Sequence, residues 1–159
     1  MKDIGMEPLE TAQVLARIHA QEVAPRYLLE PGDIVFRSRG NNNSCALVMP
    51  SLGLATVIAP MMFIRIKNKS QVLPEYLHWW LNRPAIRRLI DERAQGGTIR
   101  MIPAASLADL PVDIPSLQTQ TNIVNLWALA QLEGKLVQEI AKRNGTWLDA
   151  KLAQLAKQL

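Results

Sequence analysis

The distribution of proline divides this sequence into two parts of different character. All ten prolines lie within the first 115 residues, and the rest of the chain holds none of them and only two of the eight glycines. Proline removes a backbone donor and clashes with the preceding helical turn, so a long stretch without it can form uninterrupted helix. We therefore predict an α+β fold, with a mixed α/β domain over residues 1–118 and a long helix or helical hairpin over residues 119–159.

The predicted arm carries apolar residues at helical spacing. Leu132, Leu136 and Ile140 share one face, and Leu148, Leu152, Leu155 and Leu159 repeat at intervals of four, three and four, which is typical of a coiled-coil seam. Residues 144–146 (Asn-Gly-Thr) either break the helix or are tolerated within it at a cost of about 1 kcal/mol. The sequence leaves both open. It predicts a dimer or partner interface at Leu132, Leu136, Ile140, Leu148, Leu152 and Leu155.

Short β-type runs and turns alternate in the first part of the chain. We expect a hairpin in which strands 34–36 and 45–49 flank a polar loop, because β-branched and aromatic runs are separated there by Gly and Asn. Weaker patterns predict a helix or mixed segment over 9–23 and strands over 54–58, 61–66 and 99–102. A helix is predicted from residue 74 to 93 with a pause near 82–84, followed by a capped turn over 106–110 and an extended segment over 111–115.

The net charge of +4 is unevenly distributed along the 159 residues. Residues 1–33 carry a net charge of about −3, residues 34–100 about +7, and residues 101–159 about zero. Neutralising phosphates supplies most non-specific affinity for nucleic acid, so a basic middle third favours a polyanionic partner. The alternative is an ordinary solvated surface.

Two loops in this basic region have a composition suited to DNA. Arginine can fork onto guanine and asparagine onto adenine, while glycine lets the backbone approach phosphates. We predict that the first loop and the Gly-Gly-Thr loop read bases or phosphates, and that two turn lysines position the backbone. The predicted DNA-binding residues are Arg37, Ser38, Arg39, Asn41, Asn42, Asn43, Lys67, Lys69, Gly96, Gly97, Thr98 and Arg100.

Residue clusters with catalytic spacing are absent from the sequence. His19 and His78 are far apart, Cys45 has no evident partner base, and no glycine-rich phosphate loop is present. We therefore predict no enzymatic activity, no cofactor and no metal. The single cysteine, and the lack of a secretory signal or a long apolar run, make a cytoplasmic protein without membrane contact the default expectation.

Four motifs occur in an order that resembles a known family. Residues 28–40 contain Gly32-Asp33-Ile34, residues 73–82 begin Leu-Pro-Glu-Tyr-Leu, residues 96–100 begin Gly-Gly-Thr, and residues 107–124 alternate Leu, Pro and Ile before Gln120. Together they resemble the target-recognition domain of a type I restriction-modification DNA specificity subunit. The chain departs from that pattern at Thr119, where the family carries an acid, and its segment before residue 28 is short.

The resemblance implies a non-catalytic DNA reader. Such subunits carry two recognition domains, whereas this chain has one domain and one arm, so it resembles a half-subunit. The resemblance implies double-stranded DNA as a partner, a homodimer built through antiparallel arms, and docking of the methyltransferase subunit, with the restriction subunit as a further candidate. The alternatives are a protein-interaction adaptor or truncated homologue that does not bind DNA, and a small nuclease.

Overall fold

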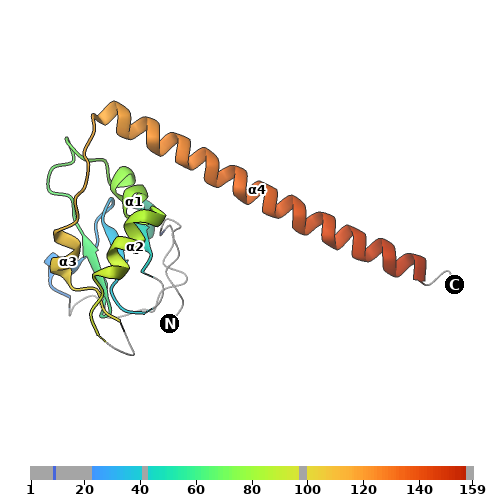
Figure 1. Cartoon of the computed structure of the whole chain (residues 1–159), viewed down its shortest axis with the longest axis horizontal. Coiled ribbons are helices and arrows are strands. Elements are labelled where there is room, and N and C mark those ends of the chain that lie inside the picture. The colour runs from blue at the N-terminus through green and yellow to red at the C-terminus, as the bar shows by residue number, and fades with distance from the viewer. Residues whose placement is uncertain (1–8, 10–22, 41–42, 97–99, 157–159) are drawn as a thin grey trace. The chain divides into compact units, whose positions relative to one another are not determined.

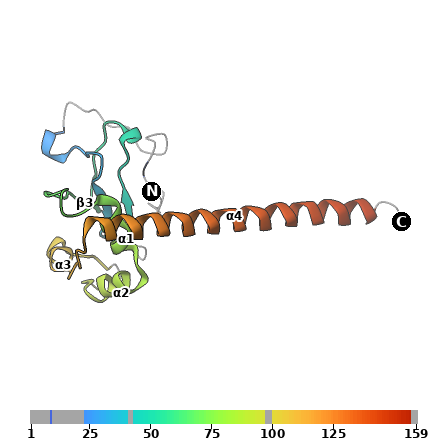
Figure 2. The ribbon, with the colours of Figure 1, turned by 90° about the horizontal axis from the view of Figure 1, so that it is seen from above.

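The computed structural model describes residues 9, 23–40, 43–96 and 100–156, which fall into two units. The first unit, Met1–Thr121, is mixed α+β, and the second, Asn122–Leu159, is helical. Figures 1 and 2 show its helix, α4 (Leu117–Ala156), as one uninterrupted rod. The predicted fold class is therefore confirmed at the level of an α+β chain with a long C-terminal helix.

A three-stranded antiparallel sheet forms the centre of the first unit. Its strands are β1 (Ile34–Arg37), β2 (Cys45–Leu47) and β3 (Met61–Ile64), in the order β2-β1-β3. Val35 lies opposite Ala46 on one side and Phe63 on the other. The predicted hairpin is confirmed, and the strand predicted over 61–66 is found in shorter form.

Both faces of β1 are covered. Ile34, Val35 and Phe36 are each no more than 1% exposed, and successive strand residues point to opposite faces. Val35 packs with Leu29, Val48 and Leu52 on one face. Helix α1 (Pro74–Asn82) packs against β2, so the small sheet is enclosed rather than open to water.

The predicted pause separates α1 from α2 (Pro84–Glu92), as expected. Arg83 between them is extended, with φ −61° and ψ 137°, because the ring of Pro84 disfavours helical geometry in the residue before it. The predicted capped turn is a short helix, α3 (Ala104–Ala108), and residues 111–115 form neither helix nor strand. Two further 3-10 turns are η3 (Pro25–Tyr27) and η4 (Pro50–Leu52).

Three predicted elements differ from the structure or lie outside it. The strand over 54–58 is wrong: only Thr56 makes a bridge, to Leu28, because β3 already occupies the neighbouring edge of β1. The segment 9–23 lies outside the described residues except for its ends. Of residues 99–102, residue 99 is also outside them, and Met101 makes only isolated bridges.

Helix α4 continues through residues 144–146, so the helical-hairpin alternative is wrong. The Thr146 hydroxyl donates to the Lys142 carbonyl at 3.1 Å, one turn back in the same helix, instead of capping a new one. One glycine costs about 1 kcal/mol in a helix interior, which the many hydrogen bonds of a 40-residue helix can absorb.

The last residue of α1, Asn82, closes the outer edge of β2. Its Oδ1 accepts from the Cys45 N–H at 3.3 Å, and its Nδ2 donates to the Cys45 carbonyl at 3.1 Å. A side-chain amide thus takes the place of a fourth strand at an edge that would otherwise leave buried backbone groups without partners.

We expect Asn82→Ala to destabilise the first unit by about 1–3 kcal/mol, because it strands the Cys45 N–H inside the protein and leaves the Cys45 carbonyl with His78 Nε2 alone. Urea denaturation followed by fluorescence of the buried Trp80 measures the loss. Asn82→Asp, which keeps the acceptor and loses the donor, is the matched variant. A change below 0.5 kcal/mol in both variants would contradict the role given to Asn82.

Candidate nucleic-acid interface

The Gly32-Asp33 motif fixes the start of β1. Gly32 has φ +91°, which glycine adopts without strain, and a Cβ there would lie 3.1 Å from Cγ of Pro74. Its N–H donates to the Val48 carbonyl at 2.9 Å. The motif therefore joins the hairpin to the first turn of α1.

Asp33 holds Arg65 in a two-pronged ion pair. Its carboxylate is buried and accepts from Nε at 2.9 Å and from Nη2 at 2.6 Å. The hydrogen bond to Asp33 raises the pKa of Arg65 above its ordinary value. Arg65 also pairs with Glu30 and donates to the Leu28 carbonyl. Arg65, one of the ten Lys and Arg residues in the basic region 34–100, therefore stabilises the fold through these contacts.

The two loops predicted to contact DNA are brought side by side. We call the described residues of these two segments, 37–40 with 43 and 95–96 with 100–101, the paired loops. The Ser38 carbonyl accepts from the Ile102 N–H at 2.8 Å, Arg39 is bridged to Met101, and the Gly40 N–H donates to the Arg100 carbonyl at 3.4 Å. Segments about 60 residues apart in sequence therefore form one surface, which the sequence alone did not predict.

Two of the predicted DNA-binding side chains are buried and form hydrogen bonds to residues beneath the paired loops. Ser38 is buried, and its hydroxyl donates to the Pro60 carbonyl at 2.6 Å. Asn43 is buried as well, and its Nδ2 donates to Oδ1 of Asp91 at 2.7 Å. Both positions shape the surface from beneath, so we assign neither of them a contact with bases.

One exposed cation, Arg100, lines a small polar cavity beside the paired loops. Its volume is about 190 Å³, and it is lined by Gly40, Asn43, Asp91, Ala94 and Arg100. Arg39 and Arg100 are exposed, and Arg37 is half-buried at the end of β1. Nη2 of Arg100 donates to the Asp91 carbonyl.

Asp91 is the residue that sequence reasoning missed. Its side chain accepts from Asn43 of the first paired loop, and its carbonyl accepts from Arg100 of the second. In the sequence, Asp91 lies four residues after Arg87, which places both residues on one face of α2. This spacing is the only local pattern that draws attention to Asp91.

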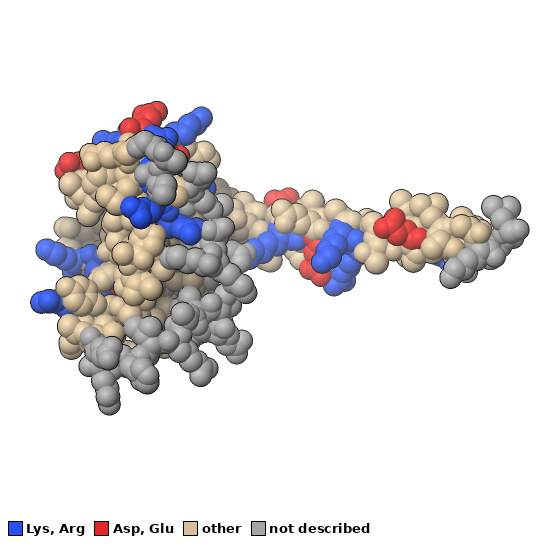
Figure 3. Space-filling view, turned by 90° about the horizontal axis from the view of Figure 1, so that it is seen from below, with Lys and Arg blue, Asp and Glu red and all other residues tan. Residues whose placement is uncertain are grey.

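The two predicted lysines lie elsewhere. Lys67 and Lys69 are exposed, and Nζ of Lys69 donates to the Pro31 carbonyl at 3.3 Å. Pro31 precedes β1, whereas Arg39 follows it, so the two basic groups are at opposite ends of the strand. Gly96 is exposed with φ +104°, and the predicted positions Asn41, Asn42, Gly97 and Thr98 lie outside the described residues. Figure 3 shows the basic side chains of the visible face at several separate places.

His78 and Cys45 are buried residues that contact each other in the core. Nε2 of His78 lies 3.1 Å from the Cys45 carbonyl, and both residues are buried. Burial raises the pKa of the Cys45 thiol to about 12, so the reactive thiolate is scarce at neutral pH. In the described part of the chain, no three His, Cys, Asp or Glu side chains are grouped to hold a metal ion.

The arm exposes much apolar surface. Ten large apolar side chains of α4 between Leu126 and Leu155 are at least half exposed. At 100° per residue, the Leu132–Leu136–Ile140 face is centred about 130° around the helix from the Leu148–Leu152–Leu155 face. Because the helix is continuous, the two predicted interface clusters are separate faces.

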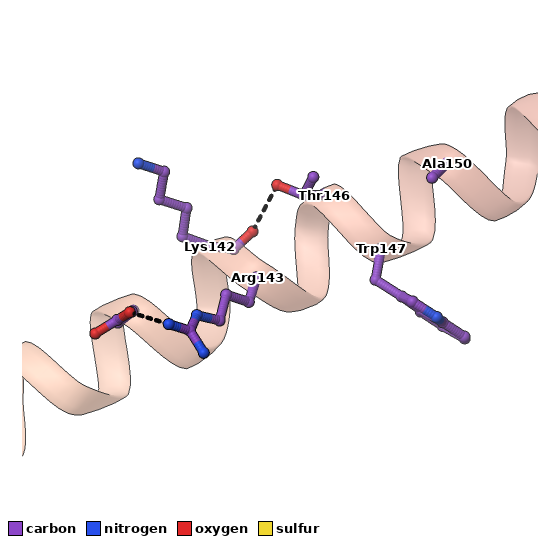
Figure 4. Close-up of a pocket in the computed structure, with 6 residues that line it drawn as sticks. Lys142, Arg143, Thr146, Trp147 and Ala150 are labelled. Carbon is purple, nitrogen blue, oxygen red and sulfur yellow. Dashed lines mark hydrogen bonds and ion pairs between the residues drawn. The ribbon is translucent and has the colours of Figure 1, made fainter.

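A shallow groove lies beside the first of these faces. Figure 4 shows Trp147 projecting on a different side of the helix from Lys142, with Arg143 paired to Glu139. The groove is lined by Glu139, Lys142, Arg143, Thr146, Trp147 and Ala150.

No family model and no curated protein matches the chain. The family resemblance therefore stands on the four sequence motifs. Within the residues that the structure describes, no helix is both long and apolar enough to cross a membrane.

Proposed function

We propose that this protein is a non-catalytic DNA-recognition subunit, with the paired loops as the DNA-contacting surface. The single observation that carries this proposal is the backbone pairing of two distant loops, which places exposed Arg39 and exposed Arg100 on neighbouring segments, with Arg100 lining a polar cavity. Arginine is the side chain best suited to fork onto guanine or phosphate, and Gly40 lets the backbone approach a ligand closely.

The motif order and the arm extend the proposal. A half-sized specificity subunit of the type I restriction-modification kind would read one half-site with its single recognition domain. Two copies joined through their arms would then read a symmetric, interrupted sequence. In this proposal the methyltransferase subunit docks on the exposed apolar surface of α4. Ten large apolar side chains that are at least half exposed form that surface.

Binding to a mixed-sequence 30-base-pair duplex tests the proposal. We expect affinity to fall steeply with salt, because each neutralised phosphate contributes about −0.9 to the log–log slope. Removing one phosphate-contacting arginine reduces the slope by about one. Arg39→Ala combined with Arg100→Ala is therefore expected to lower it by about two and to weaken binding at least tenfold at 0.1 M salt.

Arg26→Ala is the matched control, since Arg26 is an exposed arginine stacked on Tyr27 and lies outside the paired loops. Arg26→Ala and Arg39→Ala each remove one positive charge, so these two single variants are compared directly, and Arg26→Ala is expected to change binding less than twofold. Equal losses in both variants would show a diffuse charge effect and contradict the assignment of this surface.

A protein-interaction adaptor is the second candidate, and the apolar exposure of α4 is the observation that favours it. It predicts negligible duplex binding even at low salt together with a self-associating or partner-binding arm. The salt titration separates the two functions, because the adaptor gives a flat line where the DNA reader gives a steep one.

A further inference from the structure

Seven described positions of α4 fall on one straight stripe, which we call the seam. At 100° per residue, positions 130, 134, 137, 141, 148, 152 and 155 lie within about 60° of one another. The first four residues are smaller than leucine, and the last three are leucines. In chain order the seam consists of Ala130, Gly134, Val137, Ala141, Leu148, Leu152 and Leu155.

The small and large halves of the seam are arranged as an inverted pair. Ala141 and Leu148, Val137 and Leu152, and Gly134 and Leu155 are each equidistant from the point between residues 144 and 145. If two copies met in antiparallel fashion about that point, each of these three layers would combine one leucine with one smaller residue. In a parallel pair, leucine would meet leucine at one end and glycine would meet glycine at the other, leaving cavities.

We propose that a second copy of this chain docks antiparallel on the seam, with the two-fold axis passing between Asn144 and Gly145. This inference rests on the dimer in the proposed function, adds its face and register, and gives the expected antiparallel orientation a packing reason. The seam is about 40 Å long on a helix about 10 Å across. A strip of that length and width covers about 400–600 Å² per chain, so two chains together bury about the 1,000 Å² in total that a specific interface needs.

The glycines of the arm agree with a close neighbour. A Cβ added to Gly134 or Gly145 would meet nothing within 4 Å in the single chain. Each glycine costs a helix about 1 kcal/mol relative to alanine, so packing within the chain gives no reason for it. A partner helix whose leucine must approach the backbone at Gly134 does give a reason.

The remaining apolar face is then left for a different partner. Leu129, Leu132, Leu136, Ile140 and Trp147 lie within about 80° of one another, and the centre of this face is more than 100° from that of the seam. Antiparallel pairing on the seam would leave these side chains accessible in the dimer.

Cysteine cross-linking tests orientation and register. The native Cys45 is fully buried with a raised pKa, so wild-type protein gives the background. In the proposed dimer, residue 137 of one copy lies about 22 Å along the axis from residue 137 of the other, beyond disulfide reach. We expect no covalent dimer from Val137→Cys or Leu152→Cys alone, and efficient covalent dimer from the chain carrying both.

Asn144→Cys supplies the central position, where the two copies of the residue are offset by about 1.5 Å along the axis. We expect it to cross-link by itself. Light scattering on each reduced variant gives the mass before oxidation. A monomer in every case overturns the proposed dimer, whereas a dimer in which Val137→Cys cross-links to itself overturns only the antiparallel register.

An exchange of side-chain size tests the same pairing without cross-links. Gly134→Leu is expected to weaken dimerisation at least tenfold by overpacking against Leu155 of the partner subunit, and Leu155→Ala to weaken it by leaving a cavity. The chain with both changes is expected to recover most of the affinity, because the layer regains its volume. Additive losses in the double variant would overturn the pairing of positions 134 and 155.

Discussion

Replacing Arg65 by methionine is expected to destabilise the first unit by about 3–5 kcal/mol. The change leaves the buried carboxylate of Asp33 with one described donor, the Glu30 N–H at 2.8 Å, in place of three. Removing one partner of a buried ion pair strands the other charge, and that penalty exceeds the value of an exposed pair several-fold. Urea denaturation followed by Trp80 fluorescence measures the effect.

Two variants control this result. Asp33→Asn in the Arg65→Met background removes the stranded charge, so it is expected to recover about half of the lost stability. Arg26→Met removes an exposed arginine that lies over the ring of Tyr27, as Arg65 lies over that of Phe63, and it is expected to cost less than 0.5 kcal/mol. If Arg65→Met costs less than 1 kcal/mol, the ion pair does not hold the start of β1.

Replacing Gln120 by leucine is expected to cost about 3 kcal/mol or more. Gln120 is fully buried, and its amide accepts from the Leu73 N–H at 2.9 Å and donates to the carbonyls of Gln71 and Pro115 at 2.8 Å. Leucine has a similar size but removes the partner of all three half-buried hydrogen bonds, at about 1 kcal/mol or more for each.

The loss at Gln120 also has a local readout. The Leu73 amide precedes α1, so its hydrogen exchange is expected to accelerate in Gln120→Leu before the rest of the unit opens. Gln118→Leu, on the exposed side of the same turn, is the control and is expected to cost less than 0.5 kcal/mol. Equal effects of the two variants would contradict the structural role of Gln120.

These residues also explain three of the four sequence motifs in physical terms. Asp33 closes the ion pair with Arg65, Asn82 closes the edge of β2, and Gln120 ties the first turn of α4 to the start of α1. Ser116 caps α4 by accepting from the Thr119 N–H at 3.2 Å, and the Thr119 hydroxyl lies 2.9 Å from that of Ser116. Threonine therefore contacts the cap where the family pattern has an acid.

The sequence by itself determined the features that depend on local chemistry. The absence of proline after residue 115 permits the long helix, Pro84 separates α1 from α2, and the polar loop between apolar runs forms the hairpin. Each of these follows from backbone sterics or short-range hydrogen bonding, which a few neighbouring residues control.

Tertiary structure decided everything that depends on distant partners. The strand expected over 54–58 did not form because β3 paired with β1, and Ser38 and Asn43 turned inward because Pro60 and Asp91 offered them hydrogen bonds. The paired loops met because Arg39 and Met101 bridge across about 60 residues. Such contacts follow from which buried groups find partners, and neither composition nor periodicity along the chain encodes that choice.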